Sequence, residues 1–193
     1  MNSWVLPMIV EKAVDKTVWI FNFVLYSFGG FLLEVAFARV TRNPKKDRKC
    51  FYLLPLCPVY GLGAVGILAL PDAILQNVWL LFFCGGMVAT LTEYAVGFLD
   101  EKIMGVAFWD YSHLPLNVGG KVCLLFSGLW GILAVVLVRV LHPLVAAVTA
   151  QIPLFLALPL LVLVAGDGLR SAVLLRRTRS PRCLMWYCSQ PTF

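Results

Sequence analysis

The stretch TVWIFNFVLYSFGGFLLEVAFA, residues Thr17–Ala38, is apolar over the length of a membrane crossing yet contains Glu34. The stretch QNVWLLFFCGGMVATLTEYAVGFL, Gln76–Leu99, is similar and contains Glu93. About 20 apolar residues cross the hydrocarbon core of a bilayer. An acidic side chain at the centre of such a helix costs about 2.5–3.5 kcal/mol on insertion scales, so it is kept where it faces a partner, a cavity or a substrate path. The two stretches predict a multi-pass membrane protein with a polar site in its interior.

The composition supports this class. The chain has 193 residues, of which 61% are hydrophobic and 13% charged, whereas soluble domains are about half apolar and a quarter charged. Two more long apolar runs follow, Val122–Leu141 and Ala150–Leu175. We therefore predict an all-α membrane helix bundle, with one transmembrane domain over residues 1–175 and a basic cytoplasmic tail over residues 176–193.

A fifth apolar run, Pro58–Leu70, is short and rich in glycine. Runs of about 10–14 residues are often re-entrant, but apolar residues upstream extend this run to a span from about Tyr52, broken by Pro55 and Pro58. With five spans, most loop cations fall on one side, as cytoplasmic loops require: Arg39, Arg42, Lys45, Lys46, Arg48, Lys49, Lys102, Lys121, Arg170, Arg176, Arg177, Arg179 and Arg182. The predicted topology is five spans with the N-terminus outside and the C-terminus in the cytoplasm; the sequence does not specify which membrane.

This topology brings Glu34, Glu93 and Asp167 to a similar depth near the cytoplasmic side. Small or hydroxyl residues lie on the same helix faces as the two glutamates, at spacings of three, four and seven: Ser27, Gly30, Gly86, Thr90 and Gly97. Such residues permit close helix contact in membranes. The acidic faces are therefore expected to point toward other helices.

The connection after the third span is polar and aromatic, which is typical of the membrane interface. It adds partners for the buried carboxylates, so the predicted polar cluster comprises Glu34, Tyr60, Glu93, Tyr94, Trp109, Asp110, Tyr111, Asn117 and Lys121. The proline-broken start of the second span is expected to line the same site, since helix carbonyls freed by proline need a polar partner. The residues assigned to this break and to close packing are Pro58, Gly61, Gly63 and Gly97.

Several of these motifs occur together in a known family. Leu54-Pro55-Leu56-Cys57-Pro58-Val59-Tyr60-Gly61, Glu93-Tyr94, Trp109-Asp110-Tyr111, Asn117 with Gly120-Lys121, and Trp130-Gly131 resemble the CmpB-type membrane family. That family is described as a type IV ABC-transporter permease and has bacterial members and vertebrate multi-pass relatives. The resemblance implies a transporter or permease-like subunit. Lys121 replaces the arginine usual in the family, which removes a planar bidentate donor.

Other functions stay open. An intramembrane enzyme would use Glu93 or Asp110 as general base and Lys121 to bind a phosphate or carboxylate, but no Ser/His or Cys/His pair is visible at a common depth. A lipid-binding scaffold without turnover is a further alternative. In a purely structural alternative, the three carboxylates pair with Lys121, Lys102 or Arg170 and lock the helices together.

Several other patterns carry no separate function. The GLGAVG sequence at Gly61–Gly66 lacks the strand that precedes a dinucleotide-binding turn, and the six cysteines form no C-x-x-C pair. We therefore expect no cofactor and no metal. We also expect no nucleic acid, because the positive loops account for the net charge of +6. The expected partners are membrane lipids and either further copies of the chain or another membrane subunit. Reversible palmitoylation is an option at Cys50, Cys183 and Cys188, which lie near basic residues.

Overall fold

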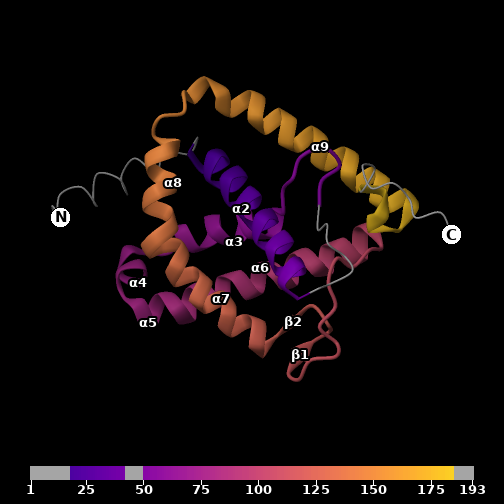
Figure 1. Ribbon diagram of the computed structural model, residues 1–193, viewed down its shortest axis with the longest axis horizontal. Helices are drawn as coiled ribbons and strands as arrows, with labels where there is room; N and C mark the ends of the chain where they lie inside the picture. The colour runs from indigo at the N-terminus through magenta and orange to yellow at the C-terminus, as the bar shows by residue number, and fades with distance from the viewer. Residues whose placement is uncertain (1–17, 42–49, 185–193) are drawn as a thin grey trace.

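The computed structural model describes residues 18–41 and 50–184 (Figure 1). Four of its helical segments are long and apolar enough to cross a membrane: Val18–Val40, Val78–Met104, Leu124–Thr149 and Leu154–Thr178. A shorter apolar helix, α3 (Pro58–Leu68), corresponds to the predicted short span. The all-α membrane helix bundle is confirmed. Most cations of the first connection and the end of the basic tail lie outside the described residues.

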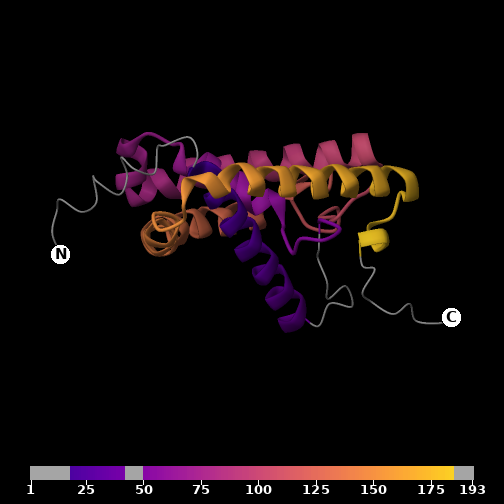
Figure 2. The ribbon, with the colours of Figure 1, turned by 90° about the horizontal axis from the view of Figure 1, so that it is seen from above.

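The first helix, α2 (Val18–Val40), packs against α3. Seen from above, the C-terminal end of α2 runs obliquely out of the layer that contains α6 and α9 (Figure 2). Two glycines make the α2–α3 contact close. A Cβ atom on Gly30 would lie 2.2 Å from the Tyr60 ring, and one on Gly61 would lie 2.2 Å from Ser27 Oγ. Backbone approach at small residues is the usual way in which membrane helices associate.

The second long helix is continuous over several segments. After α4 (Asp72–Gln76) it comprises α5 (Val78–Leu80), a π-helical turn (Leu81–Gly85), α6 (Gly86–Leu99) and a second π-helical turn (Asp100–Met104). It begins at Asn77, whose side chain accepts the N–H groups of Trp79 and Leu80. It ends at Gly105, whose φ of 68° is a left-handed conformation that glycine adopts without strain.

A hairpin follows, formed by β1 (Asn117–Val118) and β2 (Val122–Cys123). The turn passes through Gly119 and Gly120, with φ of 57° and 68°. Two consecutive positive φ values are those of a tight hairpin turn, in which glycine is strongly preferred. Because of this turn the chain re-enters the bundle directly at the next helix.

The third long helix comprises α7 (Leu124–Val136), a π-helical turn (Leu137–Leu141) and α8 (His142–Thr149). Figure 1 shows α8 leaving α7 at an angle. Pro143 accounts for the bend, since its ring clashes with the carbonyl four residues earlier and it has no N–H to donate. A 3-10 turn (Leu154–Leu156) then leads into α9 (Ala157–Thr178), which is followed by a short 3-10 helix (Pro181–Leu184). Because α9 ends at Thr178, the predicted domain boundary at 175/176 falls inside this helix and stays a prediction.

The chain before α3 is held by α9. Ser171 Oγ accepts the N–H of Tyr52 at 2.8 Å, and the carboxylate of Asp167 accepts those of Leu53 and Leu54 at 2.7–3.0 Å. Cys57 then donates its N–H to the carbonyl of Ser27 on α2, at 3.0 Å. Backbone donors in a segment without regular structure need such acceptors when they are buried. These bonds fix the place at which α3 begins.

Candidate functional site

Glu93 on α6 is 4% exposed and uses both carboxylate oxygens. Tyr111 donates its hydroxyl to Oε1 at 3.0 Å, and Trp130 on α7 donates its indole N–H to Oε2 at 2.7 Å. Burial, and then the Glu93 carboxylate, raise the pKa of Tyr111, so its hydroxyl keeps the proton that it donates. Both of these donors are neutral. They orient the Glu93 carboxylate without balancing its charge.

Glu34 on α2 joins the same group through aromatic side chains. Its Oε1 accepts the hydroxyl of Tyr60 on α3 at 2.7 Å. The Tyr60 ring lies edge-to-face on the Trp130 ring, with 5.3 Å between the centroids, which is a favourable arrangement for two aromatic rings. Trp130 therefore contacts Tyr60 with its ring and Glu93 with its N–H. We call this set, Glu34, Tyr60, Glu93, Tyr111 and Trp130, the inner cluster.

Lys121 lies apart from the inner cluster, in an ion pair. Its Nζ is 2.5 Å from Glu101 Oε2, and it also donates to the carbonyl of Gly119 at 3.3 Å. Trp109 donates its indole N–H to the carbonyl of Lys121 at 2.8 Å. The structure thus places Lys121 with an acidic residue that the sequence analysis did not select, rather than with Glu93.

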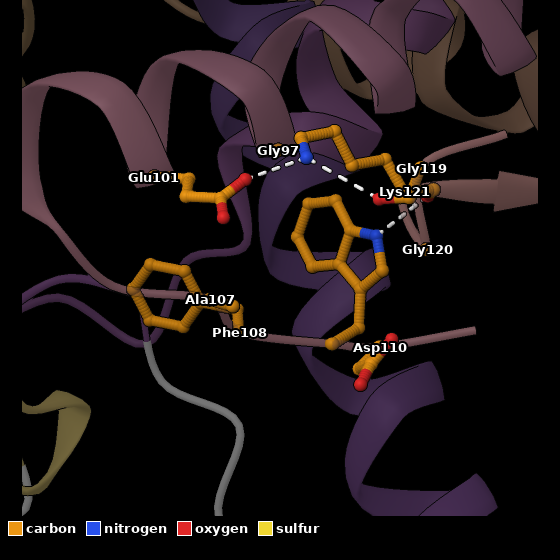
Figure 3. Close-up of a pocket in the computed structure, with 9 residues that line it drawn as sticks. Gly97, Glu101, Ala107, Phe108, Asp110, Gly119, Gly120 and Lys121 are labelled. Carbon is orange, nitrogen blue, oxygen red and sulfur yellow. Dashed lines mark hydrogen bonds and ion pairs between the residues drawn. The ribbon is translucent and has the colours of Figure 1, made fainter. Parts of the chain in front are cut away.

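These groups surround a cavity of about 190 Å³, which we call the interface pocket (Figure 3). Glu101 and Lys121 point toward each other on one side of it, and Asp110 lies on the opposite side. Its wall on α6 includes Gly97, where a Cβ atom would lie 3.0 Å from the Trp109 ring. The lining residues are Gly97, Glu101, Ala107, Phe108, Trp109, Asp110, Gly119, Gly120 and Lys121.

One face of a single helix connects the two sites. Glu93, Gly97 and Glu101 follow each other at intervals of four residues, and such residues lie above one another on a helix. Glu93 belongs to the inner cluster, while Gly97 and Glu101 line the interface pocket. The two sites are therefore neighbours along α6, about one helical turn apart.

Asp110 and Asn117 organise the connection itself. Asp110 Oδ1 accepts the N–H of Ser112 at 2.8 Å, and this bond holds the pKa of Asp110 below its usual value. Asn117 donates its amide to the carbonyls of Leu114 and Ser112 and accepts the N–H of Gly120. These bonds shape the loop that carries Tyr111 to Glu93.

The other residues predicted for the site make packing contacts or begin a helix. Tyr94 is 37% exposed and stacks on Phe98, away from the carboxylate that precedes it in the sequence. Pro58 begins α3, and Gly61 permits the close contact with Ser27. Gly63 lies against α6, where its nearest neighbour is the Cα atom of Ala89, 4.0 Å from the position of a Cβ atom.

Asp167 was expected at a similar depth to the two glutamates, and its contacts are with the backbone of another segment. Both of its oxygens accept backbone N–H groups from the segment that precedes α3. Arg170, expected as a counterion in the structural alternative, lies over the Tyr52 ring, 4.1 Å from its centroid. Asp167 therefore positions the start of α3.

Trp130 and Glu101 were not predicted as site residues from the sequence. Trp130 was noted only as part of a motif, although an indole N–H buried in a membrane helix needs an acceptor. Glu101 lies two helical turns after Glu93 and could have been found from that spacing. Within the described residues, no three His, Cys, Asp or Glu side chains are grouped as a metal site would require.

Comparison with known proteins gives a family assignment. No curated protein and no solved structure matches the chain. The family described as "Putative ABC-transporter type IV" matches residues 21–169. This range includes the inner cluster, the interface pocket and most of α9. The chain therefore belongs to this family, the CmpB-type ABC-transporter type IV family.

Proposed function

We propose that the chain is a permease-like membrane subunit in which the inner cluster binds a proton or another small monovalent cation. The observation that carries this proposal is Glu93: its carboxylate is buried, and both oxygens are oriented by neutral donors. Ionisable groups inside membranes are costly and commonly mark ion pathways. Glu34 supplies a second acidic group beside it. The family description, an ABC-transporter type, favours transport over catalysis.

Further polar groups lie along α2. Asn22 Oδ1 and Ser27 Oγ are buried there, with no hydrogen-bond partner among the described residues. Tyr26 contacts His142 on α8, with 2.9 Å between the hydroxyl and Nδ1. Asn22 lies twelve residues before Glu34, about 18 Å along a helix. These groups form the remainder of the proposed route through the bundle.

The orientation belongs to the same proposal. With the N-terminus outside and the C-terminus in the cytoplasm, α2 enters from the outside and Glu34 lies near the cytoplasmic side. A tag placed after Phe193 should then bind antibody only after intact cells are permeabilised. Binding to unpermeabilised cells would contradict this orientation.

The transport proposal predicts a flux that depends on Glu93. Purified full-length protein in liposomes, with a trapped pH-sensitive dye and a potassium potential set by valinomycin, should take up protons faster than protein-free liposomes. Parallel vesicles with a sodium gradient and a trapped sodium-sensitive dye test whether the protein transports Na⁺ instead of protons. Glu93→Gln keeps an oxygen and the shape of the side chain but not the charge, so it should insert normally and lose the flux.

Glu101→Gln is the matched control, since Glu101 lies on the same face of the helix but is 60% exposed and outside the inner cluster. It should retain the flux. The proposal fails if the wild-type protein transports neither ion above the rate of protein-free liposomes, or if Glu93→Gln transports as well as the wild type.

The interface pocket favours a second candidate function, binding of a phospholipid headgroup. Lys121 offers a cation to a phosphate, while Glu101, Asp110 and the aromatic Trp109 suit a positively charged amine.

If the pocket binds a headgroup, Lys121→Ala should reduce the amount of phosphatidylcholine that remains bound to the protein in native mass spectrometry. Lys102→Ala, a control at the same end of α6 whose cation lies over Phe98, should not. Equal lipid retention in both variants would argue against this candidate.

A further inference from the structure

Two cysteines outside the inner cluster and the interface pocket lie in contact. The Sγ atoms of Cys50 and Cys57 are 3.4 Å apart. Cys57 is 4% exposed, whereas Cys50 is half-buried at the end of the connection from α2. Six residues separate them in the sequence, a spacing that indicates no known thiol motif. Their proximity results from the fold of the intervening segment.

That segment is held on both sides. Asp167 and Ser171 on α9 accept three of its N–H groups, and Cys57 donates its own N–H to Ser27 on α2. Leu56 donates to the carbonyl of Leu54 at 2.9 Å, which closes the turn. The two sulfur atoms are therefore presented to each other by a fixed backbone. They need to approach by only about 1.4 Å to reach the bond length of about 2.05 Å.

We propose that Cys50 and Cys57 form a reversible disulfide site, oxidised by a low-molecular-weight disulfide such as glutathione disulfide. The Cys50 thiolate, on the more exposed residue, attacks one sulfur of glutathione disulfide and releases one glutathione thiolate. The Cys57 thiolate then attacks Cys50 Sγ and releases the second. Two protons leave the protein thiols and two glutathione thiols form, so the protein loses the two electrons that glutathione disulfide gains.

The surroundings make this a slow reaction at neutral pH. The hydrogen bond with Cys57, and then burial, raise the pKa of the Cys50 thiol, and the acidic neighbours Asp100 and Glu34 act in the same direction. Because the thiolate is the nucleophile, the rate of oxidation should increase as the pH rises above 7.

The site is placed to affect the inner cluster. Cys57 is the residue that caps the start of α3, and Tyr60, which donates to Glu34, lies three residues later. A bond between Cys50 and Cys57 would tie the end of the first connection to this helix start. The disulfide would then restrict the backbone of the segment that positions Tyr60, in addition to the hydrogen bonds from α2 and α9.

The test uses the purified full-length protein in detergent. After incubation with glutathione disulfide at pH 8, denaturation and labelling with a polyethylene-glycol maleimide, four of the six thiols should react instead of six, and dithiothreitol should restore all six. Chymotrypsin cuts after Phe51 and Tyr52, between the two cysteines. The link should therefore appear in mass spectrometry as a joined pair of peptides that reduction separates.

Single variants identify the residues. Cys57→Ser should keep glutathione attached to Cys50 as a stable mixed disulfide, while Cys50→Ser should form no link at Cys57. Cys84→Ser and Cys123→Ser, which remove cysteines elsewhere in the bundle, should still form the Cys50–Cys57 link. The proposal is overturned if the wild-type protein keeps six reactive thiols, or if glutathione remains on Cys50 although Cys57 is present.

Discussion

Replacing Asp167 with alanine should lower the free energy of unfolding by about 3 to 5 kcal/mol, since a hydrogen bond to a charged group contributes about 1.5–3 kcal/mol and a buried donor without a partner is costly. Asp167 is 4% exposed, and it accepts the N–H groups of Leu53 and Leu54. Alanine would leave both donors without this acceptor. The measurement is thermal unfolding of the purified protein in detergent, followed by tryptophan fluorescence.

Two further variants test whether the loss of stability comes from the hydrogen bonds that Asp167 accepts. Asp167→Asn retains one oxygen that can accept a hydrogen bond, so its loss of stability should lie between those of the wild type and Asp167→Ala. Asp72→Ala removes an exposed carboxylate at the start of α4, where a change within about 0.5 kcal/mol is normal. If Asp167→Ala unfolds at the wild-type temperature, the role assigned to Asp167 in holding the start of α3 is wrong.

The sequence was sufficient to predict the helices because the physical signal is simple. A long apolar run forms a helix in a bilayer, because a helix satisfies all of its backbone hydrogen bonds within the same segment. The helices extend beyond the predicted spans at their ends. Gln76–Leu99 was ended before Asp100, Glu101 and Lys102, but the helix continues to Met104, where Gly105 permits the left-handed turn. Charged side chains at the membrane edge do not stop a helix; a change in backbone conformation does.

The third long helix extends beyond the apolar run predicted for it. Val122–Leu141 was ended before Pro143, whereas the helix continues to Thr149 with a bend. Proline removes one hydrogen bond, and a π-helical turn before it accommodates the ring. A single sequence does not show whether a proline ends a membrane helix or bends it, because the outcome depends on what packs around the bend.

The helix faces of the site could be predicted, but its partners could not. Spacing placed Ser27, Gly30 and Glu34 on one face, and in the structure Ser27 and Gly30 are buried there. By contrast, Lys121 pairs with Glu101, and Asp167 binds backbone N–H groups. Partner choice depends on where a hairpin turns and where α9 crosses the chain. Those are tertiary features with no periodic signal in the sequence.

Replacing Gly30 with alanine should destabilise the protein by about 3 kcal/mol, at the upper end of the usual cost of overpacking a core. The added Cβ would lie 2.2 Å from Cγ and 2.4 Å from Cβ of Tyr60. These atoms are the base of the side chain, so rotating the ring does not relieve the clash and α3 must move away from α2. The movement should also break the hydrogen bond from Tyr60 to Glu34, so ion flux in liposomes should fall together with stability.

The neighbouring glycine is the matched control. Gly29 lies on the same helix one residue earlier, and a Cβ atom there meets nothing within 4 Å. Gly29→Ala therefore adds the same methyl group without a clash, and stability should be unchanged or higher, since alanine is favoured over glycine in helices by about 1 kcal/mol. Thermal unfolding of both variants in one detergent separates the effect of contact from that of helix propensity. Equal behaviour of Gly29→Ala and Gly30→Ala would contradict the close α2–α3 contact, and with it the placement of Tyr60 on Glu34.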